Sequence, residues 1–142
     1  MATTDPRFYK SLTLKLTNVG KNQIETLPDR IDVYGGQLIL KSYCVQFDTD
    51  NSLNNEVNVN IYGISQISNV NNSMDFLTLP VSRNGDKTTF HYTDTVCFVQ
   101  GHRLNPTIRY DLLDDSSPPT DTFNGNVPVA VYLTFQYLST GI

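Results

Sequence analysis

The chain has 142 residues and a formal net charge of −4, and 39% of its residues are hydrophobic while only 17% are charged. A chain of this length usually forms one domain, which buries enough surface to fold without a metal or a disulfide. Its basic residues are sparse and spread along the sequence, whereas a nucleic-acid-binding domain normally carries a clustered basic face. The composition therefore argues against nucleic acid as a main partner.

Eight runs alternate apolar and polar residues with a period of two, the pattern of strands that have one buried face. In chain order the predicted strands are residues 7–19, 35–47, 56–64, 75–81, 87–92, 95–99, 107–113 and 127–138. The first run places Leu12, Leu14 and Leu16 on one face. The last run has its apolar set at Val127, Val129, Val131, Leu133, Phe135 and Tyr137. We expect these two strands to contribute side chains to one core.

The segments between these runs contain residues that favour turns. Residues 21–33 are expected to hold shorter, less regular strands, because Pro28 cannot donate a hydrogen bond within a central sheet. Gly35-Gly36 is predicted to form a turn ahead of the next strand. The sequence also leaves room for one helical turn near residues 71–75.

The strongest hairpin signal is Asn84-Gly85, because a two-residue type I′ turn needs a positive φ at both positions. Val81 and Lys87 are expected to flank this hairpin. A turn at Gly101-His102 and a loop over residues 114–126 separate the last predicted strands.

Eight strands without sustained helical periodicity predict an all-β domain. Their loops of uneven length favour a two-sheet antiparallel sandwich of the Greek-key or jelly-roll type, first of all an eight-stranded jelly roll, over an up-and-down barrel of regular hairpins. Residues 1–142 are expected to form this single domain, with residues 1–7 as a flexible N-terminus, since no linker or internal repeat divides the chain.

Residues that could carry catalysis do not form a recognisable set. A Ser or Cys nucleophile usually needs a histidine base. His91 alternates with Thr89 and Thr93 on what is predicted to be a solvent-facing side, and His102 lies in a turn. Asp111 is expected to point outward and the next acids lie in a loop, so no pair of facing carboxylates is expected. We therefore predict a non-enzymatic protein with no cofactor and no small-molecule substrate.

An acidic loop at residues 48–56 invites a calcium-binding interpretation, because calcium prefers several oxygen ligands from one loop. The EF-hand pattern fails, since Leu53 stands where a glycine is needed and Val59 where a bidentate glutamate belongs. Another kind of calcium loop remains an alternative to a solvated turn. The prediction is that no metal is bound.

Cys44 and Cys97 lie within predicted strands and show no metal-binding spacing. The opening residues lack the charged and apolar regions of a secretory signal, so both cysteines are expected to be reduced thiols. No apolar run approaches the roughly 20 residues that span a bilayer, so no membrane partner is expected.

The eight tyrosines and seven phenylalanines mostly suit packing on sheet surfaces. Tyr62, Tyr132 and Tyr137 are nevertheless candidates for an interface, because tyrosine is enriched at protein contacts. Gln136 shares the outer side of the last strand with Tyr132, and the predicted assembly contacts are Tyr62, Tyr132 and Gln136. The absence of tryptophan, on which sugars often stack, weakens a lectin interpretation without excluding it.

Two segments, residues 35–47 and 105–138, resemble the single jelly-roll penton and minor capsid proteins of double-jelly-roll DNA viruses such as virophages. In those proteins a penultimate strand, an acidic loop and a long closing strand follow one another, as residues 108–113, 114–126 and 127–138 do here. The resemblance implies a structural subunit that forms a symmetric homo-oligomer and contacts other capsid proteins. It further implies synthesis in the host cytoplasm and residence in the virion.

Two alternatives stay open. One is a receptor- or glycan-binding head of the fibre or lectin type, and the other is an intracellular binding sandwich. An assembly subunit uses the flanks of its sheets against neighbours, whereas a binding head presents its loop tips to a ligand.

Overall fold

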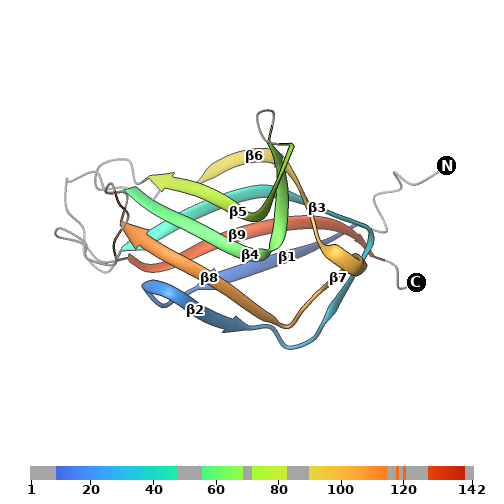
Figure 1. Ribbon diagram of the computed structural model, residues 1–142, viewed down its shortest axis with the longest axis horizontal. Helices are drawn as coiled ribbons and strands as arrows, with labels where there is room; N and C mark the ends of the chain where they lie inside the picture. Colours follow the sequence, from blue (N-terminus) through green and yellow to red (C-terminus); the bar gives the residue numbers. More distant parts are fainter. Residues whose placement is uncertain are drawn as a thin grey trace.

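The described part of the protein consists almost entirely of β-strands. The computed structural model describes residues 9–47, 56–68, 72–82, 90–114, 118, 120 and 128–139. The strands found there are β1 (Tyr9–Leu16), β2 (Gly20–Thr26), β3 (Ile31–Phe47), β4 (Glu56–Ser68), β5 (Asn72–Ser82), β6 (His91–Phe98), β7 (Arg103–Leu104), β8 (Thr107–Asp114) and β9 (Pro128–Ser139) (Figure 1). A 3₁₀ helix, Gln100–His102, lies between β6 and β7. The all-β prediction is confirmed.

The strands pair in two groups of four, and every pairing among the described strands is antiparallel. One group has the order β1-β9-β3-β6 and the other β2-β8-β4-β5, while β7 pairs with β3. Within the described residues the groups are joined through two residue pairs of β4 and β6, Ser65 with Phe98 and Gln66 with Cys97. The hydrogen-bonded sheet therefore curves strongly and almost closes on itself, with one group in front of the other in Figure 1.

The hydrophobic core lies between the two groups. The first group supplies inward side chains that include Leu14 of β1 and Leu133 of β9, which lie directly opposite each other. The second group supplies Val59 of β4 and Tyr110 of β8. Period-two alternation explains this core, because it brings every second side chain of a strand to the same face. The predicted shared core of the first and last strands is confirmed, with Leu12 partly buried at its margin.

The prediction of a turn at Gly35-Gly36 is wrong. Both glycines have φ of +70° and lie inside β3, where the register against β9 shifts between Val33 and Leu38. The amide of Val99 donates to the carbonyl oxygen of Gly36 at 2.7 Å, so this backbone stays hydrogen-bonded across the irregularity. A left-handed glycine serves a bulge as well as a turn, and here the pair bends one long strand.

Two further predictions near the middle of the chain are wrong. The runs 87–92 and 95–99 do not form separate strands, because β6 continues from His91 to Phe98. The helical turn near residues 71–75 is also not formed, since β5 begins at Asn72 and pairs with the end of β4. The region around Pro28 does contain a short, irregular strand, β2, whose register shifts between Gly20 and Gln23.

Several predicted features lie outside the described residues. They are the N-terminal residues 1–7, the acidic loop over residues 48–55, the Asn84-Gly85 turn, and the loop after β8 apart from Pro118 and Thr120.

Candidate functional site

The side of the β1-β9-β3-β6 group that faces away from the core, hereafter the outer face, carries the candidate site. Directly opposed residues of antiparallel strands project on the same side. Tyr132 on β9 lies opposite Lys15 on β1 and opposite Cys44 on β3. Further along, Ser42 on β3 lies opposite Tyr92 on β6. Four strands thus present one continuous outer surface.

Exposed apolar side chains gather along the β6 edge of the outer face. Six large hydrophobic residues are exposed in the described part of the chain, and three of them are Phe90, Tyr92 and Val96. Phe90 directly precedes β6, and 56% of its surface is exposed, against 82% for Tyr92 and 40% for Val96. Apolar side chains exposed together mark interaction surfaces more often than ordinary surface.

A hollow of about 360 Å³ lies beside Tyr132, lined by Thr13, Cys44, Gln46, Phe90, Tyr132 and Thr134. The Tyr132 hydroxyl donates to Oε1 of Gln46 at 3.3 Å. The Lys15 ammonium lies 5.7 Å from the centre of the Tyr132 ring, which is within the range of a cation–π contact. These two contacts orient the Tyr132 ring on the outer face.

The charges next to Tyr92 neutralise each other. The Lys41 ammonium and the Asp94 carboxylate form an ion pair and line a shallow hollow together with Tyr92. Both side chains are exposed, so this pair contributes at most about 1 kcal/mol to stability. Its consequence here is that a partner covering Tyr92 would not have to bury an unpaired charge.

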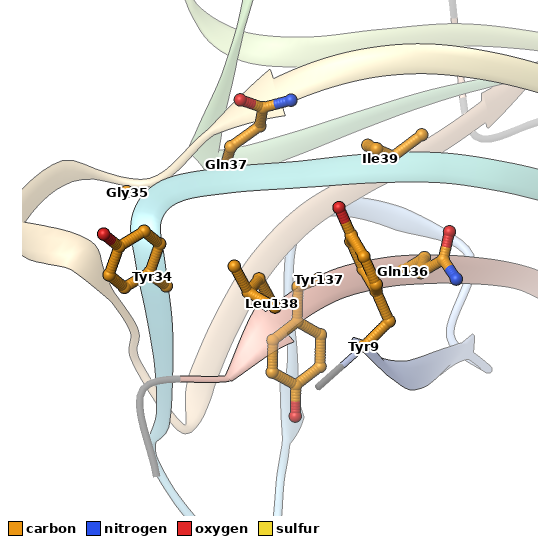
Figure 2. A pocket seen from close by; sticks show the side chains of 8 residues that line it. All are labelled: Tyr9, Tyr34, Gly35, Gln37, Ile39, Gln136, Tyr137 and Leu138. Carbon is orange, nitrogen blue, oxygen red and sulfur yellow. The ribbon is translucent and has the colours of Figure 1, made fainter. Parts of the chain in front are cut away.

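A second concavity of about 290 Å³ lies at the other end of β9, where β3 bends (Figure 2). Its lining residues are Tyr9, Tyr34, Gly35, Gln37, Ile39, Gln136, Tyr137 and Leu138. Figure 2 shows the rings of Tyr9 and Tyr34 on either side of Leu138, with the Gln136 amide next to Tyr9. This concavity is called the Tyr9–Tyr34 groove below.

The three predicted assembly contacts do not form one cluster. Tyr132 and Gln136 share the outer face but border different concavities, about 13 Å apart along β9. Tyr62 belongs to β4 in the other group, and β3 and β6 separate that strand from β9.

Tyr62 takes part in a network that joins three strands. Its hydroxyl donates to Oδ2 of Asp111 at 2.6 Å, and the amide of Asn22 donates to Oδ1 at 2.8 Å. The hydrogen bond to Asp111 is the main cause that raises the pKa of Tyr62 above its usual value. The carboxylate of Asp111 on β8 therefore holds both β4 and the irregular part of β2, where Asn22 has φ of +55°.

The prediction that Asp111 points to solvent is wrong, since only 7% of its surface is exposed. Four consecutive residues of β8, from Tyr110 to Leu113, are buried. Strict alternation fails there because the side of β8 away from the core is covered as well, and the Asp111 carboxylate is satisfied by hydrogen bonds.

The predicted solvent side of His91 is also wrong. His91 projects on the half-buried side of β6 with Thr93 and Thr95, and its ring stacks on Tyr43 with the centroids 5.1 Å apart. The exposed side of this strand carries Tyr92 instead, because His91 starts a continuous β6 in register with Tyr43. His102 lies in the 3₁₀ turn and is exposed, as predicted.

The two cysteines are free thiols, as predicted. Cys44 projects on the outer face, whereas Cys97 belongs to the core, so opposite sides of the sheet separate them. Burial raises the pKa of the Cys97 thiol to about 12, and burial also raises the pKa of Cys44. Neither thiol is therefore activated as a nucleophile at neutral pH.

Across the residues that the structure describes, no group of three or more His, Cys, Asp or Glu side chains is placed to hold a metal ion. The same residues include no helix that is long and apolar enough to cross a membrane.

The exposed side of β6 and the Tyr9–Tyr34 groove were not predicted from the sequence. Tyr92 and Val96 alternate with Thr93 and Thr95. A prediction of one continuous strand here would therefore have placed Tyr92 and Val96 on the same side of the sheet. The groove had no sequence signal, because its residues come from three strands that are distant in the chain.

Comparison of the chain with protein-family models, with curated proteins and with solved structures finds no match.

Proposed function

We propose that the chain is a non-enzymatic structural subunit that assembles with further copies of itself through the outer face. The observation that carries this proposal is the gathering of Phe90, Tyr92 and Val96 on the exposed edge of that face, where Phe90 lines one hollow with Tyr132. Aromatic residues of this kind dominate the buried centre of protein interfaces.

The strand order supports a jelly-roll sandwich as the scaffold of this subunit. A jelly roll packs two four-stranded antiparallel sheets built from two Greek keys. The two groups have the orders β1-β9-β3-β6 and β2-β8-β4-β5. Without the two-residue strand β7, strands from the first and the second half of the chain alternate in each group, as a jelly roll requires. This order agrees with the resemblance to single jelly-roll capsid proteins, and on that basis we place the protein in a virion, in contact with other capsid proteins.

A second copy of the chain suits the outer face better than a strongly charged partner. The Lys41 and Asp94 charges are paired, and the hydroxyls of Thr13 and Thr134 pair with each other at 3.2 Å. A closed, symmetric contact also requires a surface that can meet its own copy without opposing like charges. The paired Lys41 and Asp94 and the aromatic cluster at the β6 edge meet that condition, while the Lys15 ammonium above Tyr132 adds one positive charge to the face.

Light scattering after size-exclusion chromatography tests the proposal. The purified protein is expected to form a closed oligomer at concentrations of about 100 µM or below, in the range of moderate affinities. Tyr92→Ser and Tyr132→Ser should shift it to monomers, because they remove exposed contact area without touching the core. Gln136→Arg, at the margin of the contact, should act in the same direction by adding a charge.

Ile24→Ser is the matched control. Ile24 is a large exposed residue on β2, outside the outer face, with 53% of its surface exposed. This variant should keep the oligomer intact. A wild-type protein that stays monomeric, or an equal loss of oligomer in the Ile24 variant, would contradict assembly through the outer face.

A further inference from the structure

We infer that the Tyr9–Tyr34 groove is a binding site for one ring of a neutral carbohydrate. This inference does not rest on the proposed assembly, because the groove is a separate concavity from the one beside Tyr132; Gln136 is the residue that both proposals use.

The side chains of the groove combine the two properties that a sugar ring needs. The Tyr9 and Tyr34 rings offer apolar faces for the C–H side of a pyranose, and 54% of the Tyr34 surface is exposed. Gln37 and Gln136 each bring an amide with two donors and one acceptor. Such an amide can donate to one hydroxyl of a ring while it accepts from the neighbouring hydroxyl.

The charge of the groove selects a neutral ligand. None of its eight lining residues carries a formal charge. A phosphate, a carboxylate or an ammonium group would lose its hydration there without gaining an opposite charge. A polyhydroxylated neutral ligand loses water but regains hydrogen bonds from the two amides.

The size of the groove favours one ring over an extended chain. Its volume of about 290 Å³ lies at the lower limit of ligand sites, which run from roughly 300 to 1,000 Å³. A proline-rich peptide, which also docks on tyrosines, needs a long trough because it extends about 3.1 Å per residue. Here the bend of β3 at Gly35 borders the groove at one end.

The groove is built by an unusual backbone. Gly35 and Gly36 both adopt φ of +70°, and this bend carries Tyr34 to its place beside Leu138. Bulges of this kind occur next to functional sites, where they redirect a side chain.

Titration of the full-length, ¹⁵N-labelled protein with methyl glycosides tests the inference. The probes are the methyl glycosides of galactose, glucose, mannose, fucose and N-acetylglucosamine, each added to about 20 mM, well above the millimolar Kd of a weak single-ring site. At least one probe should shift the side-chain amide signals of Gln136 and Gln37 and the backbone signal of Gly35.

Two variants make the result specific. Tyr34→Ala should weaken the binding of that probe at least tenfold, because it removes an exposed ring at the edge of the groove. Ile24→Ala removes an exposed apolar side chain of β2, outside both the groove and the outer face, and should leave the affinity unchanged. The spectra themselves report whether each variant is folded.

Three results would overturn the inference. The first is that none of the five glycosides moves these signals. The second is that Tyr34→Ala and Ile24→Ala bind the sugar equally well. The third is that a proline-rich peptide moves the groove signals while the glycosides do not, which would assign the groove to a peptide.

Discussion

Leu133 and Thr134 are neighbours on β9 with opposite surroundings. Leu133 is completely buried opposite Leu14, whereas Thr134 projects on the outer face and bonds the hydroxyl of Thr13. Leu133→Ala should lower the free energy of unfolding by about 2 to 5 kcal/mol, because it removes buried surface and leaves a cavity. Thr134→Ala should cost less than about 1 kcal/mol. Chemical denaturation measures both values, and equal losses would mean that the facing of β9 is wrong.

Cys44 and Cys97 should resist thiol reagents in the folded protein. At about pH 8 an exposed thiol is partly ionised and reacts readily. Burial raises the pKa of both thiols above the ordinary value of 9.0, so both thiols are neutral in the folded protein at this pH. In the unfolded chain the Cys97 thiol ionises above about pH 9 while the buried thiol stays neutral, so the free energy of unfolding declines from about pH 9 until the pH reaches about 12.

A colorimetric thiol assay checks this expectation with and without denaturant. Two thiols should react in denaturant and far more slowly in the native protein. Rapid reaction of Cys97 under native conditions would refute its burial, and the absence of thiols in denaturant would reveal a disulfide.

The two glycines inside β3 should respond differently to the same substitution. Both have φ of +70°, so alanine strains the backbone at either position by roughly 1 to 3 kcal/mol. A Cβ at Gly36 would also lie 2.9 Å from the carbonyl oxygen of Val99, whereas a Cβ at Gly35 meets nothing within 4 Å. Gly36→Ala should therefore destabilise the protein by at least about 1 kcal/mol more than Gly35→Ala. Thermal unfolding of the pair tests this, and equal Tm values would contradict the close approach at Gly36.

Strands that bury one face and expose the other could be predicted from the sequence. Strands that are buried on both faces or bent by a bulge could not. β1, β4 up to Ile61 and β9 from Val131 onward alternate, so their inward residues were predicted correctly. The β8 residue Asp111 was placed wrongly because its strand is covered on both sides. The prediction of a turn at Gly35-Gly36 was wrong because two glycines in the left-handed conformation are equally compatible with a turn and with a bulge. Which strands pair, and hence which residues form a groove, depends on contacts between distant segments.

In the molecule as a whole, core residues and outer-face residues are separated, and this separation determines what a substitution affects. Inward residues such as Leu133 and Phe135 alternate on β9 with outward residues such as Tyr132 and Gln136. Substitutions on the outer face can therefore change binding while the free energy of unfolding stays nearly constant. Loss of oligomer in Tyr132→Ser together with unchanged stability would be the expected signature of a contact residue.

The pairing of β1 with β9 also determines when this protein can fold. Thr13 and Thr134 touch although they are 121 positions apart in the chain. A ribosome that adds about 5 to 20 residues per second needs about 6 to 24 s to make the second partner after the first. Throughout that interval Leu14 and Leu16 of β1 lack their strand neighbour, and such exposed segments are prone to aggregate. Refolding of the complete chain should accordingly take milliseconds to seconds in stopped-flow experiments, as for other folds dominated by distant pairings. During synthesis, the yield of folded protein should depend on how well β1 is protected from aggregation until β9 has been made.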